Sequence, residues 1–144
     1  MNLNKNIIII FVLFLFACHS EVSRIDVAKN SNIAININCE KHRQIDFYID
    51  CDIEYEQQPI MVMDFEFYKG QEQILKGGLD PLLASPKENE EKIQANGKTK
   101  WKFYGKLEGN FIPPADTIFT IKPTLIVNEQ PGLKINKFEL VLVR

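Results

Sequence analysis

Cysteine, histidine and glycine are scarce in this sequence of 144 residues, which contains three Cys, two His and seven Gly. Neither His19 nor His42 belongs to a recognisable motif with a serine or cysteine nucleophile. The chain also lacks a glycine-rich phosphate loop, an H-E-x-x-H sequence and a C-x-x-C pair. We therefore expect a protein that is not an enzyme and binds no cofactor.

An excess of basic charge is also lacking, because 17 Lys and Arg residues face 19 Asp and Glu residues, for a net charge of −2 at pH 7. A nucleic-acid-binding protein requires a basic face for the phosphate backbone. The composition therefore excludes nucleic acid as the expected partner.

Long apolar runs are absent except for residues 7–17, IIIIFVLFLFA, which follow a short polar start containing Lys5. As a helix this run would be roughly 17 Å long, whereas the hydrocarbon layer of a membrane is about 30 Å thick. The run is therefore too short to span a membrane, and its charged start and apolar centre are typical of a secretory signal.

The run ends at Leu15-Phe16-Ala17-Cys18, which resembles the lipobox of bacterial lipoproteins. The resemblance implies cleavage before Cys18, acylation of its thiol, and attachment of the mature chain to a membrane through that lipid. His19 is not the aspartate that retains some lipoproteins in the inner membrane, so the outer membrane facing the periplasm is the expected location. A plain signal peptide that contains a cysteine is the alternative.

The sequence divides into three parts on this interpretation. Residues 1–17 are the signal peptide, residues 18–32 are a lipid-anchored polar tether, and residues 33–144 are the folded domain. A brief apolar alternation at Ile25 and Val27 is consistent with an edge strand inside the tether.

Apolar and polar residues alternate in the domain with a period of two, which predicts half-buried strands. The predicted strands cover residues 33–39, 45–55, 61–67, 101–107, 119–127 and 138–143. The last of these is apolar on both faces from Leu140, which predicts a position inside a sheet. Pro123 lacks a backbone donor, so its part of a strand should lie at an edge or a bulge.

Several short strands with little helix predict an all-β protein, an antiparallel sandwich of two sheets, with a closed barrel as the alternative. The aromatic strand at Trp101, the turn at residues 111–116 and the closing strand resemble small immunoglobulin-like domains of bacterial envelope proteins. This resemblance implies an architecture and supplies no active-site residues.

The alternation is lost over residues 70–97, which contain several Gly and Pro residues. We predict a long loop here, with a short strand at Ile74 and Leu75 and a helical turn at residues 82–84. A connection of this length in a small domain is commonly functional or mobile.

Acidic residues occupy the outward parity of two predicted strands and form the candidate partner-binding face. Its members are Asp46, Tyr48, Asp50, Asp52, Glu54, Glu56, Asp64 and Glu66. Like charges on adjacent strands are unfavourable. We therefore expect the lysine row of the strand around Trp101 to lie beside the carboxylate row; that row is Lys98, Lys100, Lys102 and Lys106.

Three interpretations of the acidic row are open. The charges could specify strand pairing, bind a basic partner, or hold calcium, although a straight strand spaces carboxylates too widely for a calcium ion. Among the nearby aromatic residues, Trp101 and Phe103 have the parity of the core, and only Tyr104 is expected to point outward.

Cys39 and Cys51 remain once Cys18 is assigned to the anchor. An exported protein favours a disulfide between them. If residues 40–44 form a simple hairpin, however, the two sulfurs lie roughly 20 Å apart. A bond requires the strand of Cys39 to lie in the other sheet, and two buried free thiols are the alternative. Cys39 and His42 have a suggestive spacing but too few partners, so no metal site is expected.

These observations predict a lipid-anchored envelope protein whose domain binds a protein partner or has a structural role. The expected working surface is the 70–97 loop with the acidic face. One alternative is an immunity-type inhibitor that covers the basic cleft of a toxin. Another is a hydrolase of envelope polymer, because any two of the 19 acidic residues could converge as a catalytic pair.

Overall fold

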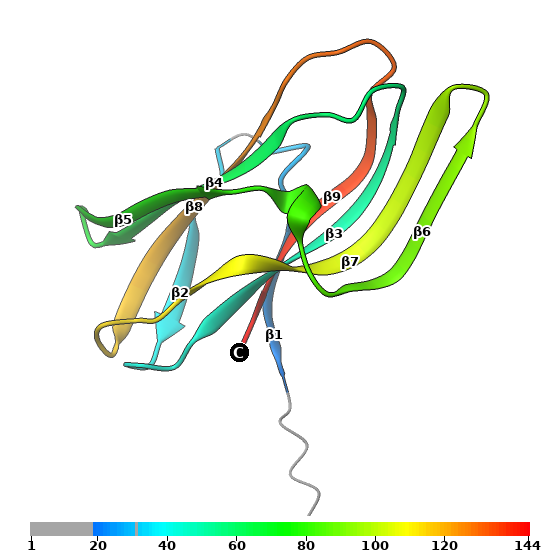
Figure 1. The fold of residues 1–144 in the computed structure, drawn as a ribbon. Helices are drawn as coiled ribbons and strands as arrows, with labels where there is room; N and C mark the ends of the chain where they lie inside the picture. Colours follow the sequence, from blue (N-terminus) through cyan, green and yellow to red (C-terminus); the bar gives the residue numbers. More distant parts are fainter. Residues whose placement is uncertain (1–18, 31) are drawn as a thin grey trace, which may run out of the picture.

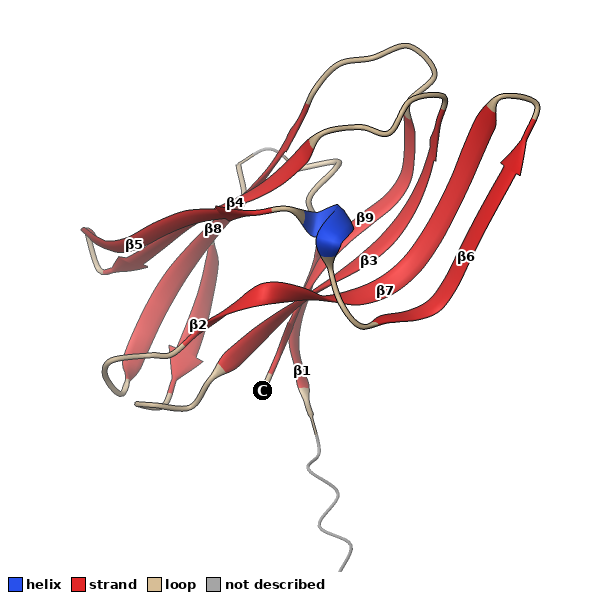
Figure 2. Cartoon of the chain, viewed as in Figure 1, coloured by secondary structure: helices blue, strands red, loops and turns tan. Residues whose placement is uncertain are grey.

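The computed structural model describes residues 19–30 and 32–144, which form two antiparallel sheets (Figures 1 and 2). Sheet A has the strand order β1-β9-β3-β7-β6, and sheet B has the order β2-β8-β4-β5. The strands are β1 (Glu21–Asp26), β2 (Ile35–Cys39), β3 (Ile45–Tyr55), β4 (Met61–Lys69), β5 (Glu72–Leu79), β6 (Lys87–Ala95), β7 (Lys98–Phe111), β8 (Thr117–Val127) and β9 (Lys134–Val143). The prediction of an all-β chain with two antiparallel sheets is confirmed, and the two sheets do not join into a closed barrel.

The signal peptide and the lipid-attachment residue Cys18 lie outside the described residues, and both remain predictions. Within the described part of the chain, no helix is long and apolar enough to cross a membrane. The helical structure found there is one short 3₁₀ turn, η1 (Pro81–Leu83).

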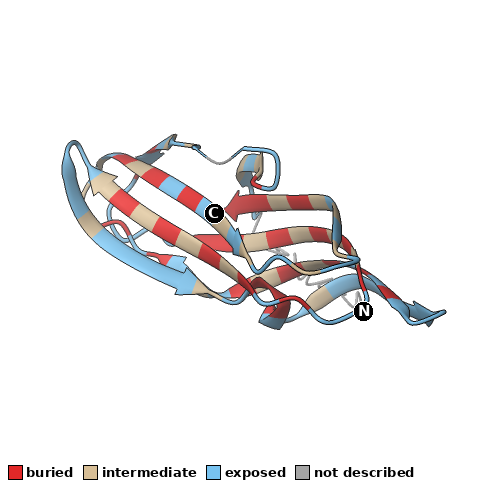
Figure 3. Ribbon diagram, turned by 90° about the horizontal axis from the view of Figure 1, so that it is seen from above, coloured by how far each residue is buried: buried red, intermediate tan, exposed pale blue. Residues whose placement is uncertain are grey.

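The period-two pattern places one face of each long strand in the core. In β3 every odd-numbered residue from Ile45 to Tyr55 is buried, and the even-numbered residues from Tyr48 to Glu54 are partly exposed. Figure 3 shows the same alternation along the neighbouring strands. The six predicted strands are all present, although their bounds shift by a few residues.

Aromatic side chains join the two sheets in the core. The Phe47 ring of sheet A stacks on the Phe65 ring of sheet B at 4.9 Å between centroids, and Phe67 of sheet B stacks on Phe111 of sheet A at 4.6 Å. Burial of such side chains contributes about 1.5–3 kcal/mol each to the free energy of unfolding. This contact between the sheets keeps their outer faces in fixed positions.

The predicted long loop at residues 70–97 is wrong, because the structure has β5, η1 and β6 there. The short strand at Ile74 and the helical turn near residue 82 are confirmed within it. The two strands lack alternation because both are sheet edges and are exposed on both faces for most of their length. The charged residues of β6 are typical of an edge strand that resists pairing with another chain.

Three other expectations concern positions in the sheets. β1 pairs with β9 at the edge of sheet A, so the polar tether does contain a strand. β9 lies between β1 and β3, which confirms its interior position. Pro123 lies on β8 beyond Ile121, where the pairing with β2 ends. The open side of β8 at that point explains how an interior strand accepts a proline.

Phe47→Ala tests the contact between the sheets. Phe47 is 2% exposed, so the substitution leaves a cavity and should lower the free energy of unfolding by about 3–5 kcal/mol in denaturant titration. Ile93→Ala is the matched control, because Ile93 is 60% exposed, and it should change stability by no more than about 0.5 kcal/mol. Equal effects of the two substitutions would contradict the packing described here.

Candidate functional site

The acidic residues predicted as one face lie on two faces. Asp46, Tyr48, Asp50, Asp52 and Glu54 point outward from β3 in sheet A, and Glu56 follows the end of that strand. Asp64 and Glu66 point outward from β4 in sheet B. The prediction of a single eight-residue face is therefore wrong, because β3 and β4 belong to opposite sheets.

The lysine row of β7 lies beside the carboxylate row of β3, as expected. Asp52 is opposite Lys102 in the register, and Glu54 is opposite Lys100. Glu54 is within 3.9 Å of the ammonium groups of both Lys98 and Lys100. Such partly exposed pairs contribute about 0.2–1 kcal/mol each. Their main effect is to favour this strand pairing over others.

Asp46 forms the closest ion pair between β3 and β7, with 3.0 Å from its Oδ2 to Lys106 Nζ. Burial raises the pKa of Asp46, but hydrogen bonds donated by Gln44 and Lys106 outweigh burial and hold the pKa below its usual value. The carboxylate therefore stays ionised and paired at neutral pH.

A second set of cations reaches the carboxylate row from the β9 side. Arg24 of β1 donates to Asp50 at 3.0 Å and to Glu139 at 2.8 Å, and it also pairs with Glu21. Lys137 of β9 lies 2.7 Å from Asp50. Hydrogen bonds to Glu21 and Glu139 raise the pKa of Arg24, and the bond to Asp50 raises that of Lys137. Sequence reasoning missed this set because it did not place β9 beside β3 or β1 beside β9.

Asp46, Asp50 and Glu54 of β3 are therefore each paired with a cation. Asp52 accepts a hydrogen bond from Asn136. The structure favours the interpretation in which the charges specify strand pairing. Within residues 19–30 and 32–144 no group of three or more His, Cys, Asp or Glu side chains is arranged to hold a metal ion.

Two tyrosines interrupt the charged rows at the middle of this face. Tyr48 of β3 and Tyr104 of β7 stack with 5.2 Å between ring centroids and 11° between ring planes. Tyr104 points outward as predicted, whereas Trp101 and Phe103 are buried. The contact between Tyr48 and Tyr104 was not predicted, because the register that brings the two rings together was not known from the sequence.

Two hollows have Tyr104 in their lining. The first, of about 380 Å³, is lined by His19, Glu21, Tyr48, Glu88, Tyr104 and Val143. The second, of about 430 Å³, is lined by Asp50, Asn89, Lys102, Phe103, Tyr104 and Lys137. Burial raises the pKa of Tyr104, so its phenol remains neutral at physiological pH. We call the two tyrosines and these hollows the tyrosine platform.

Glu88 and Asn89 are adjacent in sequence but line different hollows. The register between β6 and β7 shifts between Glu88 and Glu91, and Asn89 has a left-handed backbone with φ of 51°. Asparagine tolerates this conformation better than most residues. The irregular β6 backbone thus gives each hollow one polar side chain from this edge.

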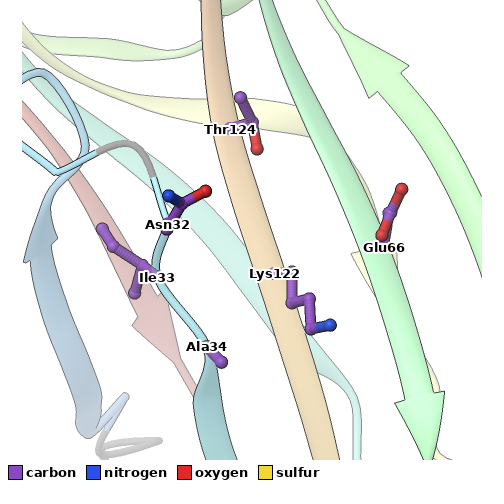
Figure 4. A pocket seen from close by; sticks show the side chains of 6 residues that line it. All are labelled: Asn32, Ile33, Ala34, Glu66, Lys122 and Thr124. Carbon is purple, nitrogen blue, oxygen red and sulfur yellow. The ribbon is translucent and has the colours of Figure 1, made fainter. Parts of the chain in front are cut away.

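A third hollow, of about 410 Å³, lies on the outer face of sheet B (Figure 4). It is lined by Asn32, Ile33, Ala34, Glu66, Lys122 and Thr124. Its charged groups already interact within the chain: Tyr68 and Lys76 donate to Glu66, and Lys122 lies 4.5 Å from the centre of the Tyr68 ring. The bond from Tyr68 is the main cause that lowers the pKa of Glu66.

Cys39 and Cys51 are both buried and free. The structure therefore has two buried free thiols, which was the alternative to a disulfide. Cys39 lies on β2 in sheet B and Cys51 on β3 in sheet A, so of the two arrangements left open, a simple hairpin or strands in different sheets, the structure has the second. Burial raises the pKa of both thiols, that of Cys51 to about 12. Neither thiol is therefore activated as a nucleophile.

No protein-family model, curated protein or solved structure matches the chain. Its fold and site define an all-β protein that exposes a pair of stacked aromatic rings on a polar, charged sheet face.

Alkylation of a Cys18→Ser chain, which retains only Cys39 and Cys51, tests the state of these thiols. At pH 8 both are expected to resist iodoacetamide in the native protein, since burial and a raised pKa suppress the thiolate. Both should be labelled in denaturant without a reductant, as read by intact mass. A native mass two hydrogens lower, with no labelling in denaturant until a reductant is added, would show a disulfide instead.

Proposed function

We propose that the protein is a lipid-anchored, non-catalytic binding module of the bacterial cell envelope, and that its binding surface is the tyrosine platform. The lipobox-like sequence ending at Cys18 supports the anchor. The observation that carries the binding role is the pair of parallel rings, of which Tyr48 lines one hollow and Tyr104 lines two, together with charged side chains. An immunoglobulin-like relationship of the sandwich is part of the proposal, supported by two antiparallel sheets packed over one apolar core.

The start of the domain lies close to the proposed anchor. Ser20, the residue before β1, exchanges two backbone hydrogen bonds with Arg144, of 2.9 and 3.0 Å. The hydrogen bonding of this sheet edge therefore starts at residue 20. Two residues beyond Cys18 span at most about 7 Å of extended chain. On this proposal the lipid holds the domain against the membrane surface, and the first residues of β1 face the membrane.

The state of the acidic residues supports binding over hydrolysis. A glycosidase needs one carboxylic acid whose pKa is raised so that it can donate a proton. The three acidic residues with a resolved shift, Asp26, Asp46 and Glu66, all have lowered pKa values instead. The ion pairs of the outward-facing carboxylates with lysine and arginine also argue against an immunity-type inhibitor. That role needs carboxylates that are free to meet a basic cleft.

Cys18→Ser tests the anchor. Two or three acyl chains hold a protein on a membrane stably, so the wild-type protein should stay in the membrane fraction after high-salt and carbonate washes. The variant should appear in the soluble fraction.

Cys39→Ala is the control, since it removes a different cysteine and leaves the lipobox intact. It should fractionate like the wild type. Retention of Cys18→Ser in washed membranes would refute the lipid anchor.

A further inference from the structure

We propose that the tyrosine platform binds a carboxylate-bearing glycan strand of the bacterial cell wall. This inference rests on the proposed envelope location and names the ligand of the proposed binding surface.

The two rings supply the apolar part of the site. Tyr48 and Tyr104 stand on adjacent strands and are parallel within 11°. Because the rings stack on each other, a sugar can meet only the face of a ring that the other ring does not cover. The face of an aromatic ring carries partial negative charge and attracts the weakly positive C–H groups on one face of a sugar ring. Tyrosine has only two side-chain torsions, so mutual stacking leaves the platform rigid before ligand binds.

The polar groups around the rings are already oriented. In the first hollow Arg24 holds the Glu21 carboxylate through two hydrogen bonds of 3.1 Å. In the second hollow Lys137 and Arg24 hold Asp50, and Asn89 adds an amide. Sugar hydroxyl groups both donate and accept hydrogen bonds. The carboxylates of Glu21 and Glu88 in the first hollow provide partners for them. In the second hollow the partners are the Asp50 carboxylate, the Asn89 amide and the ammonium groups of Lys102 and Lys137.

Lys102 favours an acidic ligand. Its side chain is exposed, and no ion pair of the described residues includes it, whereas Lys98, Lys100 and Lys106 of the same row each pair with a carboxylate of β3. Lys102 lines the second hollow beside Tyr104. A carboxylate on the glycan would be a suitable partner for its ammonium group.

The shape of the site favours a long chain over a small molecule or a protein. Tyr104 lines both hollows, so one extended chain can pass over it and occupy the two hollows together. Tyrosine is also common at the centre of protein interfaces, but there further apolar contacts surround it and exclude water. The large apolar side chains that are exposed among the described residues line neither hollow; they are Ile60, Leu75, Leu83, Ile93, Ile112, Ile118 and Ile126.

The test is co-sedimentation of the lipidated full-length protein, in mild detergent, with purified peptidoglycan sacculi. The wild type should sediment with the sacculi. Tyr48→Ala and Tyr104→Ala should each weaken apparent affinity about tenfold or more, the loss expected for a central contact. Tyr104→Phe, which keeps the ring, should stay within about threefold of the wild type.

Tyr68→Ala is the matched control, because Tyr68 is a partly exposed tyrosine on sheet B. It should bind like the wild type. Lys102→Gln should weaken binding to sacculi and leave binding to chitin, a neutral N-acetylglucosamine polymer, unchanged. Thermal melting of each variant confirms that it is folded.

Absence of sedimentation by the folded wild type would overturn the inference, as would equal sedimentation of the folded Tyr48→Ala/Tyr104→Ala variant. Binding to solubilised lipopolysaccharide but not to sacculi would also overturn it. None of these outcomes changes the result expected for Cys18→Ser, so failure of the glycan assignment is distinguishable from failure of the anchor.

Discussion

The strand β3 imposes the main constraint on this structure. Its inner face is buried along its whole length, while its outer face carries carboxylates at Asp46, Asp50, Asp52 and Glu54. Neighbouring strands that brought more acidic residues would repel it. Both of its neighbours bring cations: β7 contributes the lysine row, and β9 contributes Lys137 with Arg24 of β1 beside it. The order of sheet A satisfies burial on one face and charge pairing on the other.

The tyrosine platform follows from the same register. A shift of one residue would turn the apolar side chains of a strand to the solvent, so burial excludes every odd shift between β3 and β7. Among the remaining registers, the opposed charges of Asp52 with Lys102 and Glu54 with Lys100 favour the observed one. That register pairs Asp52 with Lys102 and also places Tyr104 opposite Asp50. Asp50 is the next outward-facing residue of β3 after Tyr48, so the two tyrosines are diagonal neighbours. The tyrosine in the carboxylate row of β3 and the tyrosine in the lysine row of β7 therefore lie next to each other on the sheet. The proposed ligand site depends on the strand pairing that the charges help to specify.

The sequence was informative where a strand has one buried face and one exposed face. Period two identified β3, β4, β7 and β8, and opposite charges predicted the contact between β3 and β7. It was uninformative for β5 and β6, because an edge strand exposed on both faces has no alternation. It also did not determine which sheet holds β2. The site was predicted only in part for the same reason: Tyr104 was expected to point outward, but its contact with Tyr48 and the hollows beside it depend on long-range register and on the irregular backbone at Asn89.

A charge-exchange cycle at Asp46 and Lys106 is the most direct measurement of the central claim that opposite charges specify the pairing of β3 with β7. Asp46→Lys and Lys106→Asp should each lower the free energy of unfolding by about 1–2 kcal/mol in denaturant titration, since each places like charges side by side. The double variant restores opposite charges and should be more stable than either single variant, with a coupling energy of about 0.5–1.5 kcal/mol that decreases as salt is added. A double variant whose loss equals the sum of the two single losses would contradict the account.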